Sequence, residues 1–88
     1  MIKTQRVMSD KAVEVFIPET KRADGNFDGR WQSTAPEKVK KSDLVRVKDG
    51  AELSMYRAIS VVKRATEGIE HVYFQYDDAH AETRKWNV

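Results

Sequence analysis

Apolar and polar residues alternate along several short stretches of this chain, which is the pattern of strands that bury one face. The clearest stretch lies near the C-terminus, where Val72, Phe74 and Tyr76 alternate with His71, Tyr73 and Gln75. After a polar interruption at residues 77–81, the alternation resumes with Trp86 and Val88 on one face. The pattern predicts a C-terminal hairpin over residues 69–88, with Phe74 and Trp86 as core residues.

The N-terminal part of the chain predicts a second hairpin. Residues 12–17 alternate well, whereas residues 2–8 alternate less regularly. Ser9 and Asp10 between these stretches are of the types that favour turns. Pro18 ends the second strand, because proline lacks the backbone N–H that a sheet requires. We therefore expect an N-terminal hairpin.

The middle of the chain is mostly a polar connection. Residues 19–42 carry glycines, a proline and no sustained periodicity, although a brief strand is predicted around residues 27–32. Residues 44–48, with the sequence LVRVK, predict a short strand. Asp49 and Gly50 supply the turn after that strand.

Residues 51–66 admit two interpretations. As a helix, they place six apolar side chains on one face and Gly68 at the C-terminal cap: Ala51, Met55, Ala58, Ile59, Val62 and Ala65. As a strand, residues 56–62 are favoured by their β-branched side chains. The local pattern slightly favours the helix, which would give an α+β fold with one helix at 51–66 packed on an antiparallel sheet.

Short motifs in the second half of the chain resemble a known family. The motifs are DLVRVKDG at residues 43–50, YRA at 56–58, VYFQYDD at 72–78 and ET at 82–83. Their order resembles the strands of small SH3-like barrels of the Tudor and KOW kind, although Ala79 and His80 stand where Tudor domains usually carry a glycine. The resemblance implies a strand at residues 56–62. We therefore predict a mainly β fold, either a small SH3-like barrel or a strongly bent antiparallel sheet with an N-terminal hairpin.

The same resemblance implies an aromatic surface or cage for a methylated ligand. Its walls would be Tyr56, Tyr73, Tyr76 and Trp86. Asp77 or Asp78 would supply the acid, because such a cage binds a cation through ring faces and a nearby negative charge.

Composition limits the class of protein. The 88 residues, of which 40% are hydrophobic and 34% charged, predict a single domain over residues 1–88 with a small core. A core of this size can gain stability through self-association, so a second copy of the chain, in a homodimer, is one expected partner. The chain has no cysteine, which excludes disulfides and cysteine-ligated metals. No apolar run approaches the roughly 20 residues of a membrane span, so we expect a cytoplasmic protein without a membrane partner.

Positive charge is concentrated in the first half of the chain. Residues 1–48 contain eleven Lys and Arg against seven Asp and Glu, whereas residues 49–88 contain five against seven. The densest basic stretch consists of Lys38, Lys40, Lys41, Arg46 and Lys48. Such side chains can neutralise phosphates while nearby aromatic rings stack on unpaired bases, so this stretch is the predicted nucleic-acid-binding site.

Two polar clusters contain residue types that bind metals. Residues 24–29, with the sequence DGNFDG, match the first half of a calcium-binding loop, but Ala35 stands where that loop needs its glutamate. The second cluster, at the polar turn of the C-terminal hairpin, consists of Asp77, Asp78, His80 and Glu82. Polar turns form for backbone reasons alone, and we therefore predict no metal site.

Catalysis has little support in the sequence. General acid–base chemistry needs a titrating group held beside a partner in a cleft, and the two histidines show no such pairing. We therefore expect a small non-enzymatic binding module without a cofactor. The first prediction is that it presents a β-sheet surface for protein interaction or self-association. The alternative is an SH3-like nucleic-acid-binding domain that uses the basic stretch at 38–48.

Overall fold

The computed structural model describes residues 1–85, which form strands, two short 3-10 helices and no α-helix. The strands are β1 (Ile2–Met8), β2 (Val13–Lys21), β3 (Phe27–Thr34), β4 (Leu44–Asp49), β5 (Glu52–Arg57), β6 (Ser60–Thr66), β7 (Ile69–Asp77) and β8 (Glu82–Lys85). The 3-10 helices are η1 (Pro36–Lys38) and η2 (Asp78–His80). The predicted mainly β fold is confirmed, and the alternative helix at 51–66 is wrong.

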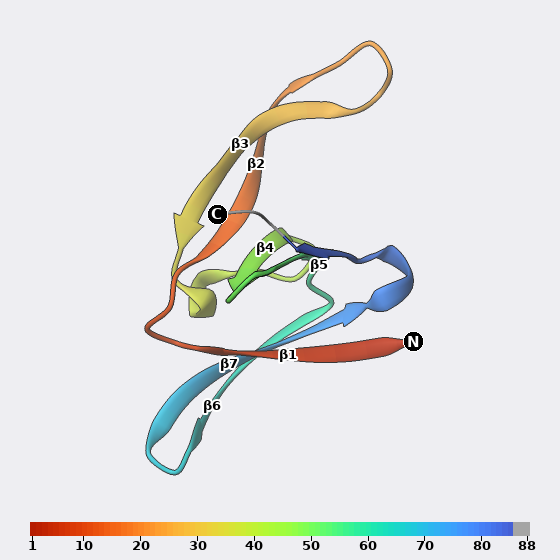
Figure 1. Cartoon of the computed structure of the whole chain (residues 1–88). Coiled ribbons are helices and arrows are strands. Elements are labelled where there is room, and N and C mark those ends of the chain that lie inside the picture. Colours follow the sequence, from red (N-terminus) through yellow and green to blue (C-terminus); the bar gives the residue numbers. More distant parts are fainter. Residues whose placement is uncertain (86–88) are drawn as a thin grey trace.

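The strands form two antiparallel sheets that pack against each other without closing into a barrel (Figure 1). The three-stranded sheet has the order β1-β7-β6, and the five-stranded sheet has the order β3-β2-β4-β5-β8. The β2–β3 hairpin projects beyond the two packed sheets (Figure 1). The whole molecule, with this hairpin included, extends over 49 × 27 × 27 Å. The architecture corresponds to the predicted bent sheet rather than to a closed barrel.

A single apolar cluster fills the space between the sheets. Its buried members are Val7, Val13, Val15, Val39, Val45, Val47, Tyr56, Ala58, Val72 and Phe74. Phe74 and Val72 are fully buried, as the alternation in β7 predicts. Trp86, the other predicted core residue, lies outside the described residues.

The predicted N-terminal hairpin is wrong. Strand β1 pairs with β7, with Val7 opposite Val72, whereas β2 pairs with β3 and β4. A tight turn after β1, closed by the Lys11 amide donating to the Met8 carbonyl at 3.0 Å, carries the chain from one sheet to the other. The turn residues were therefore identified correctly. However, β1 and β2 lie in different sheets, and their apolar faces meet across the core instead of side by side in one sheet.

The predicted C-terminal hairpin is also wrong. Strand β7 lies between β1 and β6, and β8 pairs with β5 in the other sheet. The polar interruption forms η2, which begins where the Asp77 carboxylate accepts a hydrogen bond of 3.0 Å from the Ala79 amide. This short helix moves the chain from one sheet to the other, in the way that the turn after β1 does.

The region of residues 51–66 forms β5 and β6, so strand rather than helix is confirmed there. The single strand predicted at 56–62 is wrong, because the chain leaves the five-stranded sheet at Ala58 and Ile59 and enters the three-stranded sheet. Ala58 is buried in the core, and its amide donates to the Asp43 carbonyl at 3.0 Å. Tertiary contacts thus override a helical pattern that was only slightly favoured. The predicted strands at 27–32 and 44–48 are present as parts of β3 and β4.

Candidate binding face

The side of the three-stranded sheet that faces away from the core is a candidate binding face. Directly paired residues of antiparallel strands share a face, so the register assigns nine positions to this side. They form three rows across β1, β7 and β6: Thr4, Gln75 and Ser60; Arg6, Tyr73 and Val62; Met8, His71 and Arg64. We call these nine residues, with Ile2 and Ile69 at the two ends, the outer face.

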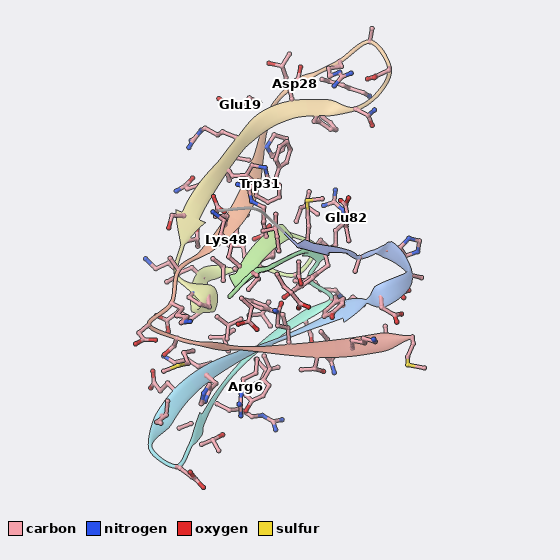
Figure 2. The ribbon with its side chains drawn as sticks, in the orientation of Figure 1. Arg6, Glu19, Asp28, Trp31, Lys48 and Glu82 are labelled. Carbon is pink, nitrogen blue, oxygen red and sulfur yellow. The ribbon has the colours of Figure 1, made fainter. Side chains whose placement is uncertain are left out.

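The outer face is open to solvent. Its apolar side chains Ile2, Met8, Val62 and Ile69 are 53%, 40%, 41% and 49% exposed. Figure 2 shows Arg6 on the side of β1 that points away from the five-stranded sheet. Trp31 and Lys48 lie on the five-stranded sheet itself. Exposed apolar side chains gathered on one face of a sheet are a common property of surfaces that bind other molecules.

Tyr73 is at the centre of the outer face. It lies directly opposite Arg6 on β1 and Val62 on β6, and Arg64 is one row further along β6. The tyrosine side chain is half-buried, and its ring centroid is 6.4 Å from that of His71. An accessible aromatic ring thus has an arginine on each neighbouring strand.

The outer face is positively charged. Neither Arg6 nor Arg64 has an ion-pair partner among the described residues, and the three rows contain no carboxylate. Asp77 lies further along the same side, opposite Ile2. The Ala79 amide holds the pKa of the Asp77 carboxyl below its usual range, so this residue is charged but already hydrogen-bonded. The two arginines are therefore available to an anionic ligand.

A pocket of about 220 Å³ opens on the outer face beside Tyr73. It is lined by Thr4, Ser60, Val62, Arg64, Tyr73 and Gln75. The Ser60 hydroxyl donates to Gln75 Oε1 at 2.8 Å, which leaves the Gln75 amide nitrogen to donate elsewhere. The pocket therefore combines an aromatic wall with hydrogen-bond donors.

The basic stretch predicted from the sequence is not brought together on one surface. Lys38 ends η1, and Lys40 and Lys41 are exposed in the following loop. Arg46 and Lys48 are on β4, on the side of the five-stranded sheet that faces away from the core. Both of these side chains contact an acidic residue there.

That acidic residue is Glu14. Arg46 donates to its two carboxylate oxygens at 3.1 and 3.0 Å, and Lys48 Nζ is 3.7 Å away. The Arg46 guanidinium also lies 4.3 Å from the ring centroid of Trp31. The Arg46 hydrogen bonds hold the pKa of the Glu14 carboxyl below its usual value. Arg46 is thus used within the protein and is not presented to a ligand.

The predicted aromatic cage is not brought together in the described residues. Tyr56 is 1% exposed, and its ring stacks on that of Tyr76 at a centroid distance of 4.0 Å, which leaves no space for a cation between them. The Tyr56 hydroxyl donates to Gln5 Oε1, and burial raises the pKa of the tyrosine. Tyr73 points to the opposite side of the sheet, and Trp86 lies outside the described residues.

The two polar clusters also have partners within the protein. In the turn that joins β2 and β3, Arg22 lies 3.1 Å from Asp24 and 3.6 Å from Asp28, so both carboxylates already form an ion pair with one guanidinium. Asp77, Asp78 and His80 form η2 and its cap. Within the described ranges, no three His, Asp or Glu side chains are grouped to hold a metal ion.

Sequence reasoning identified Tyr73 but missed Arg6, Arg64, His71 and Gln75. The available signal was the polar half of the alternation in β7, which we interpreted only as a solvent-facing side.

No match was found when the chain was compared with protein-family models, curated proteins and solved structures. The part of the chain that the structure describes contains no helix of the length and apolar character needed to cross a membrane.

Proposed function

We propose that the protein is a small non-enzymatic binding module that binds single-stranded nucleic acid on its outer face. The observation that supports this proposal is an accessible Tyr73 between two arginines that have no carboxylate partner among the described residues. The site differs from the basic stretch predicted from the sequence, because Arg46 and Lys48 contact Glu14.

Two physical effects act together on such a face. Arginine side chains neutralise backbone phosphates and release condensed counterions, which favours binding at low salt. A tyrosine ring stacks on an unpaired base, which strengthens binding with little dependence on sequence. A duplex keeps its bases stacked on each other, so the central ring favours a single strand over a double strand.

The test is the salt dependence of binding, measured by fluorescence anisotropy with a labelled single strand of about 12 nucleotides. The slope of log K against log salt is about −0.7 per phosphate neutralised on a single strand. We expect Arg6→Ala with Arg64→Ala to reduce the magnitude of this slope by at least about 0.7, because the phosphate contact of Arg6 is lost, and by about 1.4 on a strand whose phosphate Arg64 also contacts. Tyr73→Ala should weaken binding without changing the slope.

The matched control is Lys40→Ala with Lys41→Ala, which removes two exposed charges from the predicted basic stretch and should leave the slope unchanged. A slope that falls in this control and not in the arginine variant would move the site to residues 38–48. The absence of binding at about 50 mM salt would overturn the proposal.

Protein interaction is the second candidate function, and the exposed Ile2, Met8, Val62 and Ile69 favour it. Tyrosine, methionine and arginine are enriched in protein interfaces, and all three occur on the outer face. A twofold dimer through this face would bring the arginines of two copies near each other, which is unfavourable. An acidic protein segment is therefore the expected partner in this case, and polyglutamate would compete with the oligonucleotide as strongly as unlabelled oligonucleotide does.

A further inference from the structure

We infer that the pocket beside Tyr73 is a nucleobase subsite that prefers guanine, an inference that rests on the proposed function. The pocket lies on the outer face between β7 and β6, and Tyr73, Val62 and Arg64 contribute to its lining. A base that stacks on the Tyr73 ring would place one of its edges toward the polar side chains of the same pocket.

The lining of the pocket suits a flat ring. Tyr73 and Val62 are direct cross-strand neighbours and supply an aromatic and an aliphatic wall. Thr4, Gln75 and Ser60 form the adjacent row across the same sheet and supply a polar wall. The volume of about 220 Å³ leaves room for a base while its sugar and phosphate remain outside.

The polar wall contains donors from two side chains. The Arg64 guanidinium has only N–H groups. Gln75 Oε1 accepts from the Ser60 hydroxyl at 2.8 Å, and the Gln75 amide nitrogen is a further donor available to a ligand. Arg64 and Gln75 would therefore both donate to the edge of a bound base.

The Arg64 guanidinium distinguishes the two purines. Guanine presents two adjacent acceptors, O6 and N7, to which an arginine donates in a bidentate manner. Adenine presents N7 beside an amino group, which is a donor and cannot accept the second N–H of the Arg64 guanidinium. Guanine also has a larger stacking surface than either pyrimidine. These contacts together favour guanine.

The experiment uses labelled oligothymidines of about 12 nucleotides that differ only in one central base, guanine, adenine or cytosine. We expect the guanine strand to bind about tenfold more tightly than the adenine strand, since a bidentate pair gives discrimination of this order. Competition by guanosine monophosphate against adenosine monophosphate should show the same order. The guanine strand should also bind more tightly than the cytosine strand.

Arg64→Lys is the matched variant, because lysine keeps the charge but cannot donate in a bidentate manner. This variant should keep the salt slope of the wild type and lose the preference for guanine over adenine. Gln75→Ala should reduce the preference, also without changing the slope. Circular dichroism of each variant verifies that the fold is retained.

The outcomes separate this inference from the proposed function. Equal binding of the three strands, with the arginine-dependent salt slope intact, would overturn the guanine subsite and leave single-strand binding in place. A guanine preference that survives both Arg64→Lys and Gln75→Ala would place base recognition elsewhere and also overturn the subsite. Failure of every oligonucleotide to bind would overturn both proposals.

Discussion

Each of the two sheets carries an arginine on the side that faces away from the core, and the surroundings of these two arginines differ. Arg46 lies over Trp31, donates twice to Glu14 and has a side chain that is 24% exposed. Arg6 is exposed and has no carboxylate partner in the part of the chain that the structure describes. Because guanidinium groups are always charged, the difference between the two lies in the available partners. Arg46 contributes to stability, whereas Arg6 is available for binding.

Glu14→Gln tests the contribution of the ion pair between Glu14 and Arg46. The pKa of the Glu14 carboxyl is lowered from 4.5 in the folded protein, mainly by its hydrogen bonds with Arg46. A depressed folded pKa stabilises the protein above the unfolded pKa and loses this effect as the pH falls through the folded value. We expect the variant to lose about 1 kcal/mol of unfolding free energy at neutral pH.

The measurement is urea unfolding of both proteins between neutral pH and about pH 3. The difference in unfolding free energy between wild type and Glu14→Gln should shrink once the pH falls below 4.5. A difference that is constant over this range would mean that the variant acts through packing rather than through charge.

At the scale of elements, the sequence predicts strands well and their partners poorly. The alternation around Val72 and Phe74 depends only on which side of one strand is buried, which a local pattern records. One of the two partners of that strand, β1, is almost the whole chain away, and no local pattern records which apolar faces meet. Both hairpin predictions failed for this reason, since each assumed that neighbouring strands in the sequence would pair.

The same limit applies to the candidate site. Tyr73 could be selected because an aromatic residue on the polar side of a strand is unusual. Arg6 and Arg64 are its neighbours only because β1 and β6 flank β7 in the sheet. The basic stretch at 38–48 was selected because its charges are close in sequence, and Glu14, which partners two of them, comes from another strand. Its position on β2 becomes relevant only once β2 pairs with β4.

Phe74→Ala tests the element at the centre of the three-stranded sheet. Phe74 is fully buried in the core cluster, so its truncation should lower the unfolding free energy by about 3–5 kcal/mol. Tyr73→Ala is the matched control, because Tyr73 is the preceding residue, lies on the other side of the same strand and should change stability far less. Denaturant unfolding measures both. Equal losses would mean that β7 does not bury the side assigned here.

At the scale of the whole molecule, stability should be unevenly distributed. Every residue from Pro18 to Arg30 is exposed, whereas β4, β5 and β7 surround the core cluster. Segments with few buried contacts open at lower free energy than the core does. The projecting part of the β2–β3 hairpin should therefore open without the unfolding of the body.

Native-state hydrogen exchange measures this gradient. Amides between Thr20 and Asp28 should exchange first, and those of Val45, Val72 and Phe74 should exchange last, near the rate set by global unfolding. Uniform protection along β2 and β3 would show that the hairpin tip and the body unfold as one unit.

The pairing of β1 with β7 also sets the order in which the protein can form during synthesis. Residues 2–8 leave the ribosome early, but their partners at residues 69–77 follow about 60 residues later, which takes roughly 3–12 s at usual translation rates. Meanwhile the β2–β3 and β4–β5 hairpins already have all their residues. The outer face needs β1, β7 and β6 together, so a nascent chain cannot bind a ligand there until residue 77 has emerged.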